Sequence, residues 1–250
     1  MKALITGASS GIGRDISIIL SKKGYDLILV ARRMEKLEEL KRTLSTEVRT
    51  ISLDLSKEEA CFALYEQVKN EDIGILVNNA GFGIFGEFDK IDIHDELRLI
   101  NTNIKAVDIL TKLFLKDFKR KNSGYILNVA SSAAFLPGPL LSSYYASKAY
   151  VLRLTQAIYE ELRREGSKVY VGSLCPGPVD TEFNETANVK MGLKGLSSQY
   201  VADYAIKQMF NRKLTIIPGA TMKFAALFEK FVPEKLLLKI AYHMQKKKEG

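Results

Sequence analysis

The chain has 250 residues, of which 46% are hydrophobic and 26% are charged. A chain of this length can bury one large core, and α/β domains of this size commonly stay undivided. It has only two cysteines, Cys61 and Cys175, and two histidines. These numbers are too small for a disulfide framework or a His/Cys metal cluster. We therefore expect one globular domain, residues 1–250, without a bound metal.

The N-terminal segment favours a cytoplasmic location. MKALITG lacks the apolar core and cleavage site of a signal peptide, and no uninterrupted apolar run approaches the ~18 residues of a membrane span. The net charge of +8 is unevenly placed. Residues 190–250 hold 12 Lys/Arg and 4 Asp/Glu, whereas residues 1–189 hold 25 of each.

Short apolar runs alternate with amphipathic stretches along the chain. Strands are predicted at Lys2–Thr6, Asp26–Ala31, Arg49–Asp54, Ile73–Asn78, Gly124–Val129, Lys168–Cys175 and Leu214–Ile217. Helices are predicted from the stripe Ile12, Ile16, Ile19, Leu20, and at Arg33–Leu44, Ser56–Asn70, Ile93–Lys119 and Tyr144–Arg164. This alternation predicts an α/β fold: a single Rossmann-type domain whose doubly wound parallel sheet carries helices on both faces.

A glycine-rich loop joins the first strand to the first helix. It reads Thr6-Gly7-Ala8-Ser9-Ser10-Gly11-Ile12-Gly13. Glycines at these positions permit a tight turn, a close approach of the backbone to a pyrophosphate, and close packing of helix on strand. The free N–H groups at the helix start then face the anion. A purely structural turn is the alternative, but the order of strand, glycines and helix favours a dinucleotide site.

Two arginines follow the second strand, where an NAD site usually has an acidic residue. Arg32 and Arg33 can hold a 2′-phosphate with charge-assisted hydrogen bonds, whereas a carboxylate there would repel it. Glu35 is nearby but suits the first turn of a helix. A solvated helix start is the alternative for the arginines. We expect NADP(H) as the cofactor.

Tyr144 and Lys148 lie four residues apart, so one helix would present both on one face. A free tyrosine has a pKa near ~10, and a nearby ammonium would move that pKa toward neutrality, as acid–base catalysis requires. Alone, this spacing is common by chance.

With the glycine loop, this pair resembles the short-chain dehydrogenase/reductase family over about residues 1–220. The other matching segments are Asn78-Asn79-Ala80-Gly81, Asn128-Val129-Ala130-Ser131 and Pro176-Gly177 through Thr181. The resemblance implies a seven-stranded sheet. It also implies that Tyr144 transfers a proton, that Lys148 lowers its pKa and binds ribose, that Ser131 bonds the substrate oxygen and that Asn103 holds a relay water.

The resemblance also implies which residues bind the cofactor. Asp54 would contact the adenine and Thr181 the carboxamide. The full expected set is Gly7, Ser9, Ser10, Gly11, Ile12, Gly13, Arg32, Arg33, Asp54, Leu55, Asn79, Ala80, Gly81, Tyr144, Lys148, Pro176, Gly177, Val179 and Thr181.

Three assignments have competitors nearby in the sequence. Ser132 competes with Ser131, although the spacing from Asn128 and to Tyr144 favours Ser131. Asn101 competes with Asn103, and Tyr145 could also reach Lys148. In addition, Ser10 stands where NADP-preferring members often have a basic residue, which leaves Arg32 and Arg33 to carry the preference.

The C-terminal region matches the family least. Residues 184–196 are a candidate substrate lid, and residues 221–250 form a basic helical extension. Phe224, Leu227, Phe228 and Phe231 make a helical stripe, and Pro233 opens a second apolar helix. These helices could lie on an anionic membrane or form an apolar substrate mouth. Packing onto the domain is favoured. Nucleic-acid binding is not expected, because no recognition motif accompanies the charge.

The expected function is hydride transfer between NADP(H) and a small-molecule carbonyl or alcohol. Two other functions stay open: a nucleotide-binding regulator or scaffold without turnover, and a peripheral membrane protein. The resemblance implies a homo-oligomer, a dimer or tetramer, formed through the helices at Ile93–Lys119 and Tyr144–Arg164.

Overall fold

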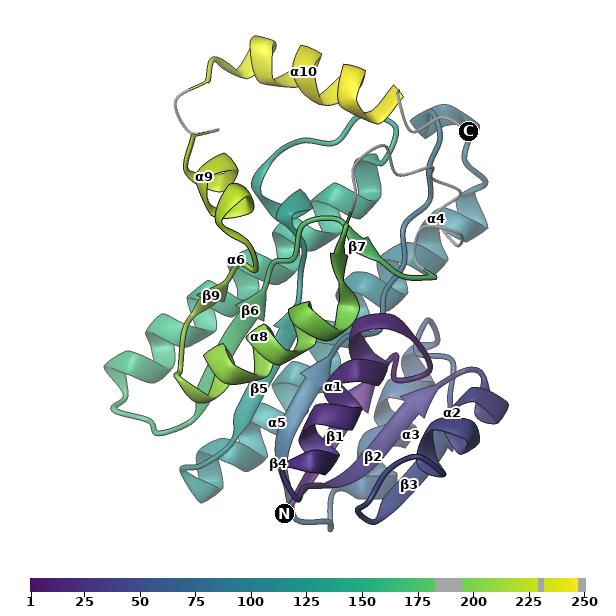
Figure 1. Cartoon of the computed structure of the whole chain (residues 1–250), viewed down its shortest axis with the longest axis vertical. Coiled ribbons are helices and arrows are strands. Elements are labelled where there is room, and N and C mark those ends of the chain that lie inside the picture. The colour runs from purple at the N-terminus through teal and green to yellow at the C-terminus, as the bar shows by residue number, and fades with distance from the viewer. Residues whose placement is uncertain (183–194, 229–231, 247–250) are drawn as a thin grey trace.

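A computed structural model describes residues 1–182, 195–228 and 232–246 (Figure 1). Its centre is a seven-stranded sheet in the order β3-β2-β1-β4-β5-β6-β9, with every neighbouring pair parallel. The strands are β1 (Lys2–Thr6), β2 (Asp26–Ala31), β3 (Val48–Ser52), β4 (Ile73–Asn78), β5 (Tyr125–Val129), β6 (Tyr170–Leu174) and β9 (Thr215–Ile216). The predicted doubly wound parallel sheet is confirmed.

Helices cover both faces of this sheet. On one face lie α1 (Gly11–Lys22), α2 (Met34–Lys41) and α8 (Ser198–Phe210), and on the other lie α3 (Glu58–Val68), α5 (Ala106–Lys121) and α6 (Ser142–Arg164). Strand side chains alternate between the two cores: Ile5 belongs to the first core and Leu4 to the second. Both faces are buried, which explains the nearly continuous apolar runs of the strands.

Helix α8 was not predicted, although the sequence contains its signal. Val201, Ala205 and Met209 are spaced four apart and fully buried against the sheet. Just before α8, the short strands β7 (Val179–Asp180) and β8 (Leu196–Ser197) form a separate parallel pair. Of the lid candidate, residues 184–194 lie outside the described residues.

The predicted single helix at Ile93–Lys119 is wrong in one detail. The structure has α4 (Ile93–Ile100), a π-helical turn η2 (Asn101–Lys105) and then α5. Such turns insert an extra residue and are frequent at functional sites. Here the turn carries Asn103, which is fully buried. Two short 3₁₀ turns complete this half of the chain: η1 (Phe88–Lys90) and η3 (Ser132–Phe135).

The C-terminal extension is helical, as predicted, with α9 (Ala220–Phe228) and α10 (Glu234–Lys246). In Figure 1, α10 runs across the top of the molecule, beyond the carboxyl ends of the strands. Ala241 and Gln245 are its buried residues, and Gln245 Nε2 donates to the hydroxyl of Tyr145 on α6. Phe231, from the predicted stripe, lies outside the described residues. None of the described helices is both long enough and apolar enough to span a bilayer.

The glycine loop is tightly packed where α1 begins. A Cβ added at Gly13 would lie 2.4 Å from the Gly7 carbonyl oxygen and 2.4 Å from Asn79 Nδ2. Neither atom is the free end of a flexible chain, because the Asn79 amide itself donates to Thr6 O and Gly7 O at 3.0 Å. Gly13 therefore permits the close approach of α1 to β1 and β4.

We predict that Gly13→Ala lowers the free energy of unfolding by about 1–3 kcal/mol, because the added methyl forces the loop and Asn79 apart. Urea denaturation measures this change. Gly86→Ala is the matched control, since its Cβ would meet only the Ile91 side chain, at 3.2 Å. An unchanged urea midpoint for Gly13→Ala would contradict the packing role.

Candidate functional site

A cavity of about 540 Å³ opens at the carboxyl ends of the strands. The strand order reverses between β1 and β4, and ligands of open α/β sheets bind in the crevice beside such a reversal. Most residues predicted to bind a cofactor line this cavity. They are Gly7, Ser9, Ser10, Gly11, Ile12, Arg32, Arg33, Asp54, Leu55, Asn79, Ala80, Gly81, Tyr144, Lys148, Pro176, Gly177, Val179 and Thr181.

The glycine loop forms one wall and fits a dinucleotide. Gly7 and Gly11 have φ of 64° and 53°, a left-handed conformation that suits glycine. A Cβ at Gly7 would lie 2.8 Å from Ala80 Cα, so a side chain there would push the loop out of its place. The Ser10 side chain makes no capping hydrogen bond to the first turn of α1. The N–H groups of a helix start favour an anion.

Arg33 is anchored across this wall. Its Nη2 lies 2.7 Å from Glu182 Oε2 and donates to Ser9 Oγ at 3.2 Å. The hydrogen bond from Arg33 is the main cause that lowers the pKa of Glu182. Sequence reasoning missed Glu182, which follows the predicted Thr181 contact directly. The ion pair joins the segment after β7 to the start of α2, beside the glycine loop.

Arg32 also lines the cavity, close to Asp54. Burial acts to raise the pKa of Asp54, but hydrogen bonds from Ser56 and the charges of Arg32 and Lys57 outweigh it and lower that pKa. Asp54 is therefore an anion that accepts from the Ser56 N–H at 3.1 Å. Arg32 and Arg33 thus share this part of the cavity with two carboxylates, Asp54 and Glu182.

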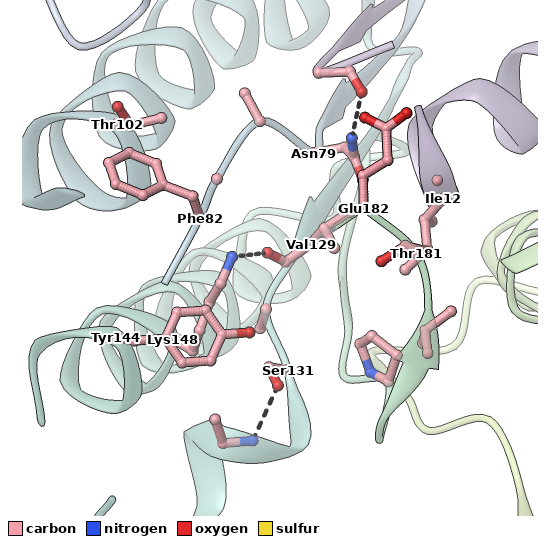
Figure 2. A pocket seen from close by; sticks show the side chains of 18 of the residues that line it. Ile12, Asn79, Phe82, Thr102, Val129, Ser131, Tyr144, Lys148, Thr181 and Glu182 are labelled. Atoms are coloured by element: carbon pink, nitrogen blue, oxygen red, sulfur yellow. Dashed lines mark hydrogen bonds between the residues drawn. The ribbon is translucent and has the colours of Figure 1, made fainter. Parts of the chain in front are cut away.

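Helix α6 places Tyr144 and Lys148 one turn apart on the cavity side, and Figure 2 shows both near Ser131. Lys148 Nζ lies 5.8 Å from the centroid of the Tyr144 ring and donates to Val129 O at 2.9 Å. Ser131 begins the η3 turn, where its Oγ accepts from Ala133 N at 3.1 Å. Ser131 and Tyr144 both line the cavity. The predicted trio is thus brought together.

The protonation of this pair differs from the prediction. Burial raises the pKa of Tyr144 to about 12, and the hydrogen bond with Ser131 offsets only part of that rise. Burial likewise lowers the pKa of Lys148 to about 8. We expect from the sequence that Lys148 moves the pKa of Tyr144 toward neutrality. For the side chains of the protein alone, this expectation is wrong. The desolvation of both groups exceeds the attraction between them.

Asn103 and Gly13 are the two predicted site residues that do not line the cavity. Asn103 Nδ2 donates to Phe82 O at 2.9 Å and to Ser147 Oγ at 3.0 Å, while its Oδ1 accepts from Phe82 N. It lies behind Gly81, whose added Cβ would be 3.0 Å from Asn103 Oδ1 and 3.2 Å from Lys148 Nζ. The π-turn thus brings Asn103 close to Lys148, and its water-holding role stays a prediction.

Two alternatives from the sequence can be compared with this geometry. Tyr145 contacts Gln245, so its hydroxyl is engaged with α10 rather than with Lys148. Ser132 also lines the cavity, but it is Ser131 that acts against burial to lower the pKa of Tyr144. The geometry favours Tyr144 and Ser131.

The other end of the cavity is apolar, and sequence reasoning missed most of it. Its lining includes Phe82, Phe135, Leu136, Leu141, Met222 and Met244. Phe82 follows the Asn79-Ala80-Gly81 segment, so its position was available from the motif. Met222 and Met244 belong to α9 and α10, so these helices contribute to an apolar substrate mouth, which the sequence offered only as a third possibility.

Comparisons with known proteins agree with this site. The family model described as short chain dehydrogenase matches residues 1–192. The chain is 35% identical over 217 residues to 17-beta-hydroxysteroid dehydrogenase type 3 of Homo sapiens, an alignment that covers 84% of this chain and 67% of that protein. It is 35% identical over 193 residues to very-long-chain 3-oxoacyl-CoA reductase of Homo sapiens, over 72% of this chain and 60% of that protein.

A solved structure is also similar over nearly the whole chain. A short-chain dehydrogenase from Sphingobium yanoikuyae in complex with NADPH has 31% identity and a TM-score of 0.83, and covers 92% of this chain and 93% of that one. A short-chain dehydrogenase/reductase from Burkholderia phymatum in complex with NAD has 25% identity and a TM-score of 0.83, over 90% and 91%. The chain belongs to the short-chain dehydrogenase family, and its site is that of an oxidoreductase that transfers a hydride between a nicotinamide nucleotide and a carbonyl or alcohol carbon.

Proposed function

We propose that this chain reduces the carbonyl group of a bulky apolar ketone with NADPH, and oxidises the corresponding alcohol in reverse. The observation that carries the proposal is the position of Tyr144. Its ring lies beside Lys148 and near Ser131, in the cavity that the glycine loop and the apolar residues line together (Figure 2). A carbonyl oxygen placed there reaches both a proton donor and a second hydrogen-bond donor.

Each residue of the trio has a distinct part in this reaction. A bound nicotinamide nucleotide supplies or accepts the hydride. Tyr144, kept protonated by a pKa of about 12, donates its proton to the substrate oxygen, as reduction requires. Ser131 hydrogen-bonds the same oxygen and stabilises its developing negative charge. Lys148 donates to Val129 O. It would also bind the ribose of the nucleotide.

The preference for NADPH rests on Arg32 and Arg33, both of which line the cavity beyond β2. A guanidinium binds a phosphate with paired, charge-assisted hydrogen bonds. Arg33 already pairs with Glu182. A 2′-phosphate would therefore either share the Arg33 guanidinium with Glu182 or displace the Glu182 carboxylate from it. We therefore assign the larger part of the preference to Arg32. Of the two similar structures described above, one holds NADPH and the other NAD.

The substrate class follows from the apolar end of the cavity. Aromatic, leucine and methionine side chains form its wall, which suits a large ring system or an acyl chain. The similar human proteins are named for a hydroxysteroid and a very-long-chain 3-oxoacyl-CoA. This chain spans 60–67% of the length of those proteins. A hydroxysteroid-like or long-chain ketone is the substrate that we propose.

We also propose a homo-oligomer that uses α4. Ile93 and Leu97 on this helix are 61% and 47% exposed, and Phe88 just before it is 67% exposed. Exposed apolar side chains this close together are typical of interaction surfaces. Burial of this group between two copies would remove it from water.

The first test of the function is NADPH oxidation, followed by absorbance, with steroid ketones, long-chain 3-oxoacyl thioesters and small ketones. We expect turnover with the bulky apolar substrates and little with the small ones. Parallel assays with NADH measure the nucleotide preference. Nucleotide binding without turnover on any substrate would contradict the proposal and favour a regulatory or scaffold function.

We predict that Tyr144→Phe lowers kcat by about 10²–10⁴-fold, because a positioned acid contributes that much to such reactions. The Kd for NADPH, measured by fluorescence, stays near that of the wild type. Tyr150→Phe is the control, since Tyr150 is an exposed residue on the same helix. Retained turnover in Tyr144→Phe would remove this residue from the reaction.

A second prediction concerns Lys148 and pH. Its folded pKa of about 8 lies below the unfolded value of about 10.4, so protonated Lys148 opposes folding by about 3 kcal/mol at neutral pH. Lys148→Met removes this cost and loses the hydrogen bond to Val129 O, worth about 1 kcal/mol. We expect the variant to be inactive yet about 2 kcal/mol more stable at pH 7.

The sign of the pH dependence provides the check. Between pH 8 and about 10 the unfolded wild type binds more protons than the folded one, so its stability rises with pH through Lys148. The stability difference between Lys148→Met and the wild type should therefore shrink over this window in urea titrations. A difference that is constant with pH would show that Lys148 is not the group responsible.

Cofactor preference gives a third prediction. Arg32→Asp should lower the ratio of kcat/KM for NADPH to that for NADH by at least about tenfold, because a carboxylate repels the 2′-phosphate. Arg42→Asp, after α2 and outside the cavity lining, is the control with the same change of charge. If Arg32→Asp leaves the ratio unchanged, the preference arises elsewhere.

A further inference from the structure

At a spacing of four, the residues of α10 form four rows, and three of these rows matter here. Leu237, Ala241 and Gln245 form the row on the domain, of which Ala241 and Gln245 are buried and Leu237 is half-buried. The residues one position earlier, Leu236, Ile240 and Met244, are 50%, 46% and 54% exposed. Each step of one residue turns the side chain by about 100° around the helix axis. An apolar row is thus left in solvent beside the contact row.

The third row is basic. Lys235, Lys239 and His243 come one position earlier again, about 100° further around, and all three are exposed. Only Glu234 opposes this charge on α10, and residues 233–250 contain five lysines and two glutamates. An apolar face bordered by lysines is typical of a helix that lies in a lipid interface. The sequence favoured packing onto the domain, which the structure shows for the contact row alone.

The apolar row leads to the active-site cavity. Met244 is more than half exposed, yet it also lines the cavity. Gln245, the next residue, holds this end of α10 to Tyr145, which lines the same cavity. The exposed apolar surface is therefore continuous with the mouth of the cavity.

We propose that α10 docks this protein on an anionic lipid bilayer. The apolar row of Leu236, Ile240 and Met244 enters the boundary between headgroups and acyl chains, and the basic row pairs with anionic headgroups. Lipid fits this surface better than a second copy of the chain does, because two such basic rows would repel each other. The mouth of the cavity then faces the bilayer, where apolar ketones accumulate. The docking itself does not depend on the proposed function.

The test is co-flotation of the full-length protein with vesicles, at low salt and at high salt. One set of vesicles contains about one third phosphatidylserine in phosphatidylcholine, and the other contains phosphatidylcholine alone. We expect binding to the anionic vesicles that weakens at least about tenfold without phosphatidylserine, and that also weakens at high salt.

The variant Leu236→Glu/Ile240→Glu should reduce binding to anionic vesicles at least about tenfold, because it places two charges in the apolar row. Both side chains are half exposed, so the fold tolerates the change, and an unchanged Kd for NADPH verifies this. The control, Met34→Glu/Phe62→Glu, adds the same charge at residues that are 39% and 45% exposed on α2 and α3. It should bind vesicles much more tightly than the α10 variant does.

Three results would overturn the proposal. The first is a wild type that ignores anionic vesicles at low salt. The second is equal loss of binding in the control and in the α10 variant, because general charge would then explain the effect. The third comes from light scattering without vesicles: if the α10 variant alone dissociates an oligomer, the row is an interface between copies. A wild-type protein that binds anionic vesicles but turns over none of the ketones would instead contradict only the proposed function.

Discussion

The site depends on how the ends of β1 and β4 are held together. The hydroxyl of Thr6 accepts from the backbone N–H groups of Asn79 and Ala80, and the Asn79 amide donates to the carbonyls of Thr6 and Gly7. These bonds join the two strands where the strand order reverses and set the position of the glycine loop. Gly13 then packs against the same atoms. The position of the glycine loop, which forms one wall of the cavity, therefore depends on the hydrogen bonds of Asn79.

A second polar network lies in the core between the elements that carry Tyr144, Lys148 and Val129. Asn78 donates to Thr111 and Asn128, and Asn128 donates to Thr155, so β4, α5, β5 and α6 are linked through the core. All four side chains are nearly or fully buried. Among the described residues, the Asn78 side-chain oxygen has no hydrogen-bond partner, while the hydrogen bonds above pair the four side chains with one another. Buried networks of paired groups favour a single arrangement. This network fixes β5, which presents Val129 O to Lys148, relative to α6, which carries Lys148 and Tyr144.

Sequence reasoning predicted the parts of the structure that depend on local patterns. The strands, the glycine loop and the Tyr144–Lys148 spacing are each set by residues close together in the chain. It missed what arises from distant segments. Met244 reaches the cavity only because α10 folds over it, and Glu182 meets Arg33 across 149 positions. It also predicted the wrong direction for the pKa of Tyr144, because burial cannot be judged from residue type. The cytoplasmic location stays a prediction.

The anchoring of α10 has a consequence for how substrate range can change. The nucleotide wall and the reacting trio come from the sheet and from α1 and α6, whereas Met222 and Met244 come from segments that follow the last strand. The two sets meet at Tyr145, whose hydroxyl accepts a hydrogen bond from the Gln245 amide. Mutations in the C-terminal helices can therefore reshape the apolar wall while leaving the hydride chemistry intact. In this protein, selectivity and reactivity can evolve separately.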